Sequence, residues 1–263
     1  MGSSSSTQRS SVPRIIGDNF SSIEEVQQAL RRANLESSNL IFAVDYTSSN
    51  QHTGKNSFGG RCLHWLDPHR EQLNPYQQAI GIIGATLESF DEDKLIPSFG
   101  FGDVNTHDRA VFPLHTDPRG CYTFKEVLER YEQVTPHVQM SGPTCFAPAI
   151  MTAVNIVRQS QNQYHILVIV ADGQVSNPRK TRDALIEASK YPLSIIVVGV
   201  GDGPWDQMEY FDDMPGRIFD NFQFVNFHKV LSQNPYHPEP AFALAALMEI
   251  PEQFHAIRKL EYL

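Results

Sequence analysis

The feature that most constrains the fold is a set of continuous apolar runs. The clearest lie within residues 40–45, 164–173 and 193–201, and helix-like segments separate them. A strand with one face in solvent alternates apolar and polar residues, whereas a continuous apolar strand is buried on both faces. Such strands in alternation with helices are typical of a parallel sheet covered on both sides. The sequence therefore predicts an α/β fold with a doubly wound, mostly parallel sheet flanked by helices.

Weaker patterns complete the predicted order of elements. Ser21 or Ser22 can cap an opening helix, because acidic residues follow in its first turn. Pro251 is expected to bend or split a closing helix. Further strands are predicted at 62–66, 95–103 and 222–227, and helices at 74–90, 124–134, 146–160, 179–190 and 240–262.

The chain divides into a short lead and one predicted domain. Residues 1–19 are serine-rich and lack a periodic apolar pattern, so they are expected to form a flexible lead. Residues 20–263 are long enough for one large domain. The net charge of −9 argues against a nucleic-acid partner, because such proteins normally carry a basic face.

The cysteines and the hydropathy of the chain indicate which kinds of protein it can be. The three cysteines are scattered, which indicates neither a disulfide framework nor a structural zinc site. They are Cys62, Cys121 and Cys145. Reduced thiols of this kind are typical of an intracellular protein. No apolar run reaches the roughly 18 residues of a membrane span.

Oxygen-bearing side chains lie directly after two predicted strands, and one more lies in the turn before a predicted helix. They are Asp45, Thr47, Ser49, Thr144 and Asp172. Parallel strands bring their carboxyl ends to one edge of the sheet, where ligands bind. Two carboxylates and three hydroxyls suit a hard cation such as Mg²⁺ or Ca²⁺, with Mn²⁺ as a further candidate. Each motif alone also has an ordinary interpretation as a turn or a helix cap.

Longer stretches give a resemblance to a known family. "DYTSSN", "NPYQQAI", "FDEDKLIPSFGFGD", "GPTCFAPAI", "YHILVIVADGQV" and "LSIIVVGVGDGPWDQM" resemble the von Willebrand factor A domain of copines. They look closest to plant copine-like RING-domain E3 ubiquitin ligases, and the likeness covers about residues 21–255. It implies a metal-ion-dependent adhesion site made by Asp45, Thr47, Ser49, Thr144 and Asp172. Many A domains outside the copines have serine where this chain has Thr47, and threonine supplies the same oxygen.

The resemblance implies a divalent-metal-dependent protein-interaction domain that recognises an acidic group on a protein partner. The alternative is the substrate-recognition part of an E3 ubiquitin ligase that works with the ubiquitination machinery. Its RING would lie on a missing segment or a partner chain, because this sequence contains no array of eight zinc-binding Cys and His residues.

No catalytic motif supports an enzyme within this chain. One enzyme alternative is a Cys145 nucleophile with His137 or His165 as base. The other is metal-assisted hydrolysis with Asp45 and Asp172. Neither is accompanied by a recognisable sequence motif, so no catalytic residue is predicted.

The N-terminus "MGSSSS" fits the myristoylation pattern, with Gly2 as the acceptor. The plant ligases that the chain resembles carry such a signal. A serine-rich start or a cloning artefact are the other interpretations. One acyl chain gives reversible membrane binding. The expected location is therefore the cytoplasm, with the plasma-membrane periphery if Gly2 is acylated, and the nucleus as a further candidate.

Overall fold

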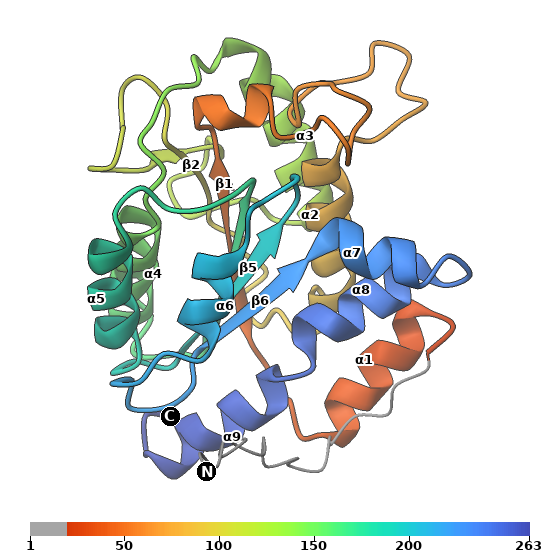
Figure 1. Ribbon diagram of the computed structural model, residues 1–263. Coiled ribbons are helices and arrows are strands. Elements are labelled where there is room, and N and C mark those ends of the chain that lie inside the picture. Colours follow the sequence, from red (N-terminus) through yellow and green to blue (C-terminus); the bar gives the residue numbers. More distant parts are fainter. Residues whose placement is uncertain (1–19) are drawn as a thin grey trace, which may run out of the picture.

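A six-stranded sheet runs through the middle of the molecule in the order β3-β2-β1-β4-β5-β6 (Figure 1). The computed structural model describes residues 20–263, so the predicted lead at 1–19 and Gly2 lie outside the described residues. Five strands pair in parallel and only the edge strand β3 is antiparallel. The strands are β1 (Asn39–Asp45), β2 (Ser98–Phe101), β3 (Phe112–Pro113), β4 (His165–Ala171), β5 (Leu193–Gly199) and β6 (Phe222–Asn226). The predicted doubly wound, mostly parallel sheet is confirmed.

The continuous apolar strands are buried on both faces, as their composition predicts. Every residue of β1, β4 and β5 is buried. Successive side chains point to opposite faces of a sheet. In β1, Phe42 and Val44 therefore pack into one core, and Ile41 and Ala43 pack into the other.

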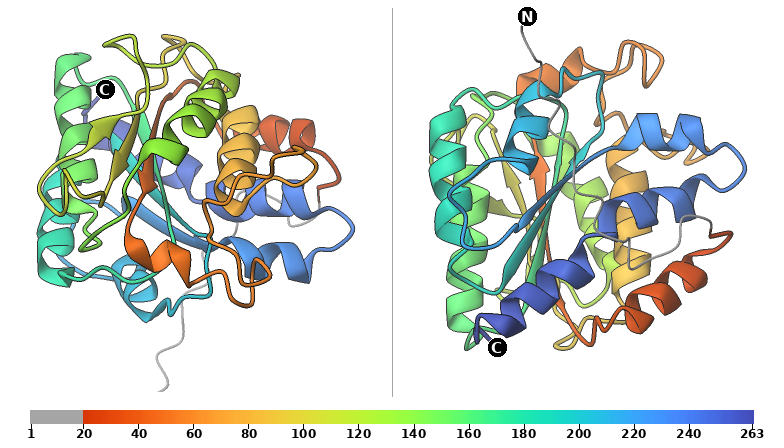
Figure 2. Two further views of the ribbon diagram at one scale, coloured as in Figure 1. Left: turned by 90° about the horizontal axis from the view of Figure 1, so that it is seen from above. Right: turned by 60° about the horizontal axis from the view of Figure 1, so that its bottom comes forward.

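Helices cover the two faces of the sheet, and Figure 2 shows α4 and α5 on the opposite side from α1 and α2. The core with Phe42 includes α1 (Ile23–Arg32), α2 (Pro75–Leu87), α3 (Phe124–Val134), α7 (Phe227–Gln233), α8 (Pro238–Leu247) and α9 (Ile250–Lys259). The core with Ile41 includes α4 (Ala147–Gln159), α5 (Pro178–Ala188) and α6 (Asp206–Asp212). Two single 3₁₀ turns, η1 (Ser48–Gln51) and η2 (Thr135–His137), complete the elements of residues 20–263. Within residues 20–263, no helix combines the length and apolar character that crossing a bilayer requires.

The predicted strand at 62–66 is wrong. The backbone N–H of Trp65 donates to the carbonyl oxygen of Cys62, which makes a turn, and Leu63 N donates to Asn50 O. This turn directs the side chain of His64 into the core, where it is buried. Apolar and aromatic composition favours a strand locally, but packing against neighbouring elements overrides that preference.

The closing segment is split into α8 and α9, as Pro251 indicates, and Pro251 lies in the first turn of α9. A proline is tolerated there because the first helical N–H groups have no partner within the helix. Two seven-residue helices, α6 and α7, were not predicted, since they are too short to show a clear apolar period.

Candidate metal centre

The five residues predicted to bind a cation lie together at the carboxyl end of the sheet, near the top of Figure 1. Asp45 is the last residue of β1, and Asp172 directly follows β4. Because β1 and β4 are parallel neighbours, their ends meet. Thr47 and Ser49 begin the turn η1, and Thr144 precedes α4.

Hydrogen bonds connect the hydroxyl groups of this set in a row. Thr144 Oγ1 donates to Thr47 Oγ1 over 3.2 Å. Thr47 Oγ1 lies 3.0 Å from Ser49 Oγ, which donates to Asp172 Oδ1 over 3.1 Å. The backbone N–H of Thr47 donates to Asp45 Oδ1 over 2.9 Å. The structure therefore brings all five side chains to one place.

The two carboxyl groups of the site are buried and face one another. Burial raises the pKa of Asp45 well above its usual range, and the charge of Asp172 raises it further. Burial also raises the pKa of Asp172, so both carboxyl groups are harder to ionise than a carboxyl group in water. Asp45 Oδ2 is buried without a hydrogen-bond partner in the described part of the chain.

No Lys, Arg or His side chain within residues 20–263 forms an ion pair with Asp45 or Asp172. Two buried carboxylates without a positive neighbour are electrostatically unfavourable. An oxygen-only donor set, an unpartnered carboxylate oxygen and uncompensated charge together fit a hard divalent cation. Ser49 is exposed to solvent, which leaves the set accessible from outside. The residues of the site therefore fit Mg²⁺, Ca²⁺ or Mn²⁺.

Sequence reasoning missed two residues of this site. Thr53 Oγ1 donates to Asp172 Oδ2 over 2.6 Å. Gly102 has a φ of +82°, and a Cβ there would lie 2.4 Å from Cγ2 of Thr47. The closely spaced glycines of "FGFG" gave the only sequence signal for such a close approach. The i, i+4 spacing from Ser49 to Thr53 could have indicated a shared helical turn.

The alternative of a Cys145 nucleophile gains no support from the geometry. Cys145 is buried, and burial raises the pKa of its thiol, which disfavours the nucleophilic thiolate. His165 Nδ1 lies 2.7 Å from the carbonyl oxygen of Gln163. His137 lies in η2, and no hydrogen bond in the described residues joins Cys145 to either histidine.

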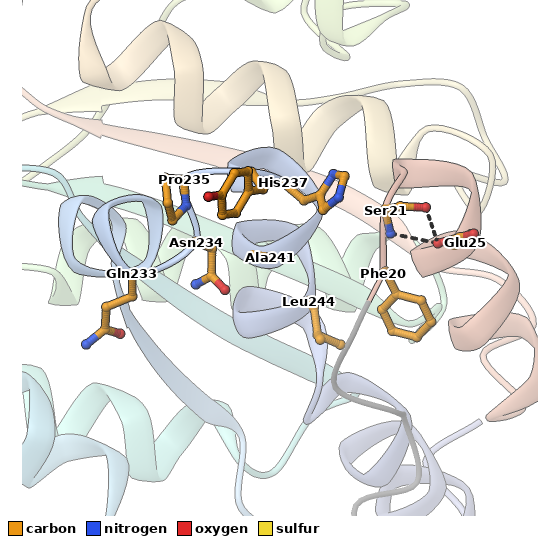
Figure 3. Close-up of a pocket in the computed structure, with 10 residues that line it drawn as sticks. Phe20, Ser21, Glu25, Gln233, Asn234, Pro235, His237, Ala241 and Leu244 are labelled. Atoms are coloured by element: carbon orange, nitrogen blue, oxygen red, sulfur yellow. Dashed lines mark hydrogen bonds between the residues drawn. The ribbon is translucent and has the colours of Figure 1, made fainter.

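A surface hollow between the start of α1 and the loop before α8 is separate from this centre (Figure 3). Its lining includes Phe20, Tyr236 and His237, and none of the five predicted ligand residues. The carboxylate of Glu25 at its rim accepts hydrogen bonds from the N–H and the hydroxyl of Ser21. That carboxylate is therefore engaged as part of the start of α1.

Comparison with known families gives a match to the copine model over residues 62–263. E3 ubiquitin-protein ligase RGLG2 of Arabidopsis thaliana is 52% identical, over 94% of this chain and 56% of the ligase. E3 ubiquitin-protein ligase RGLG3 of the same plant is 50% identical, over 97% of this chain and 73% of the ligase. Copine family protein 2 of Caenorhabditis elegans is 50% identical, over 92% of this chain and 3% of that protein. The chain thus spans little more than half the length of RGLG2.

Comparison with solved structures shows the fold alone. The N-terminal domain of TFIIH p34 superimposes with a TM-score of 0.50 at 10% identity, over 81% of this chain and 98% of that domain. A von Willebrand factor type A protein from Catenulispora acidiphila gives a TM-score of 0.47 at 11% identity, over 79% of this chain and 43% of that chain. The strand order and the flanking helices are those of the von Willebrand factor A fold predicted from the sequence.

Proposed function

The chain belongs to the copine family, and we propose that it acts as a divalent-cation-dependent protein-interaction domain. The observation that carries this proposal is the buried pair of Asp45 and Asp172. These carboxyl groups have no positive partner in the described residues, and one of their oxygens has no hydrogen bond. A bound cation would remove this unfavourable electrostatic interaction.

Each ligand has a distinct part in the proposal. Asp45 and Asp172 would neutralise the two positive charges of Mg²⁺ or Ca²⁺, and the hydroxyls of Thr47, Ser49 and Thr144 would add neutral oxygen ligands. When bound, the cation supplies a Lewis-acidic positive charge at the surface. An acidic side chain of a protein partner is the group that this charge would recognise. Asp45 and Asp172 themselves have no catalytic role in this proposal.

Calorimetric titration with MgCl₂, CaCl₂ and MnCl₂ tests this function. The wild-type chain is expected to bind at least one of these ions at a single site, and Asp45→Ala is expected to bind none. Asp91→Asn is the matched control, because Asp91 also has a buried carboxyl group but lies far from the site. Its backbone forms a β-bridge with Ser38, at the amino end of the sheet. Absence of binding in the wild type would mean that these oxygen-bearing side chains serve only in turns and helix caps.

A second candidate function is substrate recognition within an E3 ubiquitin ligase. The names of the relatives at 50–52% identity support it. In that case, the cation site would dock the protein to be ubiquitinated, and a RING would lie on another segment or chain. Determining the full natural reading frame and searching it for eight closely spaced Cys and His codons would distinguish the two candidates.

Gly2 is the proposed point of membrane attachment, on the basis of its sequence signal alone. Metabolic labelling with a clickable myristate analogue is expected to modify the wild type and to leave Gly2→Ala unmodified. Labelled protein is expected partly at the plasma membrane and partly in the cytoplasm, because a single acyl chain binds reversibly. Equal labelling of both forms would contradict this attachment.

A further inference from the structure

A stack of three buried rings lies beneath Asp45. The ring of His64 packs between Tyr46, at 4.6 Å between centroids and 10° between planes, and Tyr76, at 4.0 Å and 18°. All three side chains are buried. A histidine held between two aromatic faces has a fixed ring plane, and the hydrogen-bond partners of its two nitrogens determine how the ring is turned within that plane.

The contacts of His64 determine its tautomer. His64 Nε2 lies 2.7 Å from the carbonyl oxygen of Asp45. A carbonyl only accepts hydrogen bonds, so Nε2 carries the proton. A buried imidazole without a carboxylate partner is neutral, and its Nδ1 is then an acceptor. Tyr131 Oη lies 2.8 Å from Nδ1 and must therefore donate to it.

The hydrogen bonds continue from Tyr131 to the start of α2. Asn74 Nδ2 donates to Tyr131 Oη over 3.1 Å. Asn74 is also the N-cap of α2, where its Oδ1 accepts from the backbone N–H of Gln77 over 2.8 Å. The donors thus run in one direction, from Asn74 through Tyr131 and His64 to Asp45. We call these four residues the Asn74–Asp45 chain.

Three side chains place a donor near the carbonyl oxygen of Asp45: His64, Tyr76 and Asn50. The paired register of β1 with β4 ends at Val44 and Val170, one residue before Asp45, whereas the register with β2 includes Asp45. Tyr76 Oη and Asn50 Nδ2 lie farther from this oxygen, at 3.2 and 3.3 Å. The hydroxyl of Tyr76 is closer to Asn50 Oδ1, at 2.6 Å, which is the better acceptor for its single proton. His64 is therefore the principal donor to Asp45 O.

Two hydrogen bonds then hold Asp45 from two sides. His64 fixes the peptide carbonyl from inside the core, and the N–H of Thr47 fixes Oδ1. Oδ2 has no hydrogen-bond partner within the described part of the chain. The bond to Oδ1 opposes rotation of the carboxylate, and the bond from His64 opposes movement of the Asp45 peptide from which that side chain projects.

We propose that His64, oriented by Tyr131 and Asn74, is a positioning residue that holds the carboxylate of Asp45 ready for a divalent cation. The inference rests on the proposed function of the site and names the residues that prepare it. Groups behind metal ligands fix ligand orientation, and their removal typically weakens metal binding by about 10–100-fold. His64 contacts the peptide carbonyl of Asp45 and is not itself a proposed ligand of the cation.

Two variants test this role by calorimetry with the cation that the wild type binds best. His64→Phe keeps an aromatic ring in the stack and removes the donor to Asp45, and Tyr131→Phe removes only the hydroxyl that orients His64. Both are expected to weaken cation binding by about 10-fold or more. Tyr164→Phe is the control, because it also removes a buried tyrosine hydrogen bond, to Ser194, at the opposite end of β4. Its cation affinity is expected to equal that of the wild type.

Unchanged affinity in His64→Phe and Tyr131→Phe, beside a wild type that binds, would overturn the positioning role and leave the proposed function standing. A wild type that binds no cation would refute both.

A second measurement does not depend on the variants folding. Long-range ¹H–¹⁵N correlation spectra of the metal-free wild type are expected to show the proton of His64 on Nε2. A proton on Nδ1 would contradict the direction of the Asn74–Asp45 chain and overturn the inference.

Discussion

The carboxyl group of Asp45 lies against that of Asp172, both are buried, and no basic side chain of residues 20–263 forms an ion pair with either. The fold itself creates this contact, because the two residues end adjacent parallel strands. A metal-free protein in this state carries an unfavourable electrostatic interaction at the edge of its sheet. That interaction is the basis of the first prediction.

Asp45→Asn is expected to stabilise the metal-free protein while abolishing its response to cations. The substitution removes one of two like charges and keeps an oxygen that can accept from the N–H of Thr47. We expect the free energy of unfolding at pH 7.5 to rise by about 1–2 kcal/mol without metal. The wild type should gain about 2.7 kcal/mol at a cation concentration 100 times the dissociation constant.

Urea unfolding with EDTA and with MgCl₂ or CaCl₂ measures both effects. Asp91→Asn is the control that should keep the cation response of the wild type. Lower stability of metal-free Asp45→Asn than of the metal-free wild type would contradict the electrostatic argument.

Gly102→Ala is expected to damage the site through Thr47. A Cβ at position 102 would lie 2.4 Å from Thr47 Cγ2, so the threonine must move. We expect cation affinity to fall at least about 10-fold, and stability to fall by about 1–3 kcal/mol through overpacking and the positive φ.

Gly59→Ala separates these two causes, because Gly59 also has a positive φ, +61°, and its Cβ would meet nothing within 4 Å. This control should lose stability only and keep the cation affinity, as measured by calorimetry. Equal cation affinity of Gly102→Ala and Gly59→Ala would show that Thr47 does not contribute.

Thr53→Val is expected to weaken the site without changing its ligand residues. The variant keeps the shape of the side chain and removes the hydroxyl that donates to Asp172 Oδ2. A hydrogen bond to a charged group is worth about 1.5–3 kcal/mol, so the orientation of Asp172 should loosen. We expect about 10-fold weaker cation binding.

Thr152→Val provides the comparison for Thr53→Val, since its hydroxyl donates to Pro148 O within α4. Calorimetry should show wild-type affinity for this control. A Thr53→Val affinity within twofold of wild type would rule out a supporting role for Thr53.

The stability of the metal-free protein is expected to fall as pH rises through 7, in part because of Asp91. Burial raises the pKa of Asp91 to about 7, and the charge of Asp93 adds to the effect. A raised carboxyl pKa means that the folded state binds a proton that the unfolded state has already released. Its stabilising effect is therefore complete below about pH 4 and is lost as pH passes the folded pKa, with a slope of at most about 1.4 kcal/mol per pH unit.

Asp91→Asn removes this titration, so its stability curve between pH 5 and 8 should be flatter than that of the wild type. Unfolding by urea at half-unit pH steps in EDTA measures the difference. Parallel curves for the two proteins would place the pKa of Asp91 in its ordinary range.

The strand ends could be predicted from the sequence because they depend on a general property of parallel sheets. Asp45 and Asp172 each follow a continuous apolar run, and neighbouring parallel strands must end on the same edge. The turn before the predicted helix at 146–160 indicated Thr144 as well, and the resemblance to copine A domains implied the same five residues. The copine membership itself is confirmed by the family comparison.

The supporting residues could not be predicted, because their roles depend on contacts between distant segments. His64 belongs to a stretch with strand-like composition that folds as a turn, since Leu63 bonds to Asn50 and the ring enters the core. Gly102 is needed only because Thr47 passes close to it. Neither local propensity nor spacing carries information of this kind.

Crystals soaked in MnCl₂ offer the most direct test of the central claim, that Asp45 and Asp172 hold a divalent cation. Data collected near the manganese absorption edge identify the ion by its anomalous scattering, which carbon, nitrogen and oxygen atoms lack at this wavelength. We expect one strong anomalous peak next to the carboxylates of Asp45 and Asp172 and the hydroxyls of Thr47, Ser49 and Thr144, and no such peak in Asp45→Ala crystals. A wild-type map without a peak at this edge of the sheet, from crystals in which the site is open to solvent, would contradict the account.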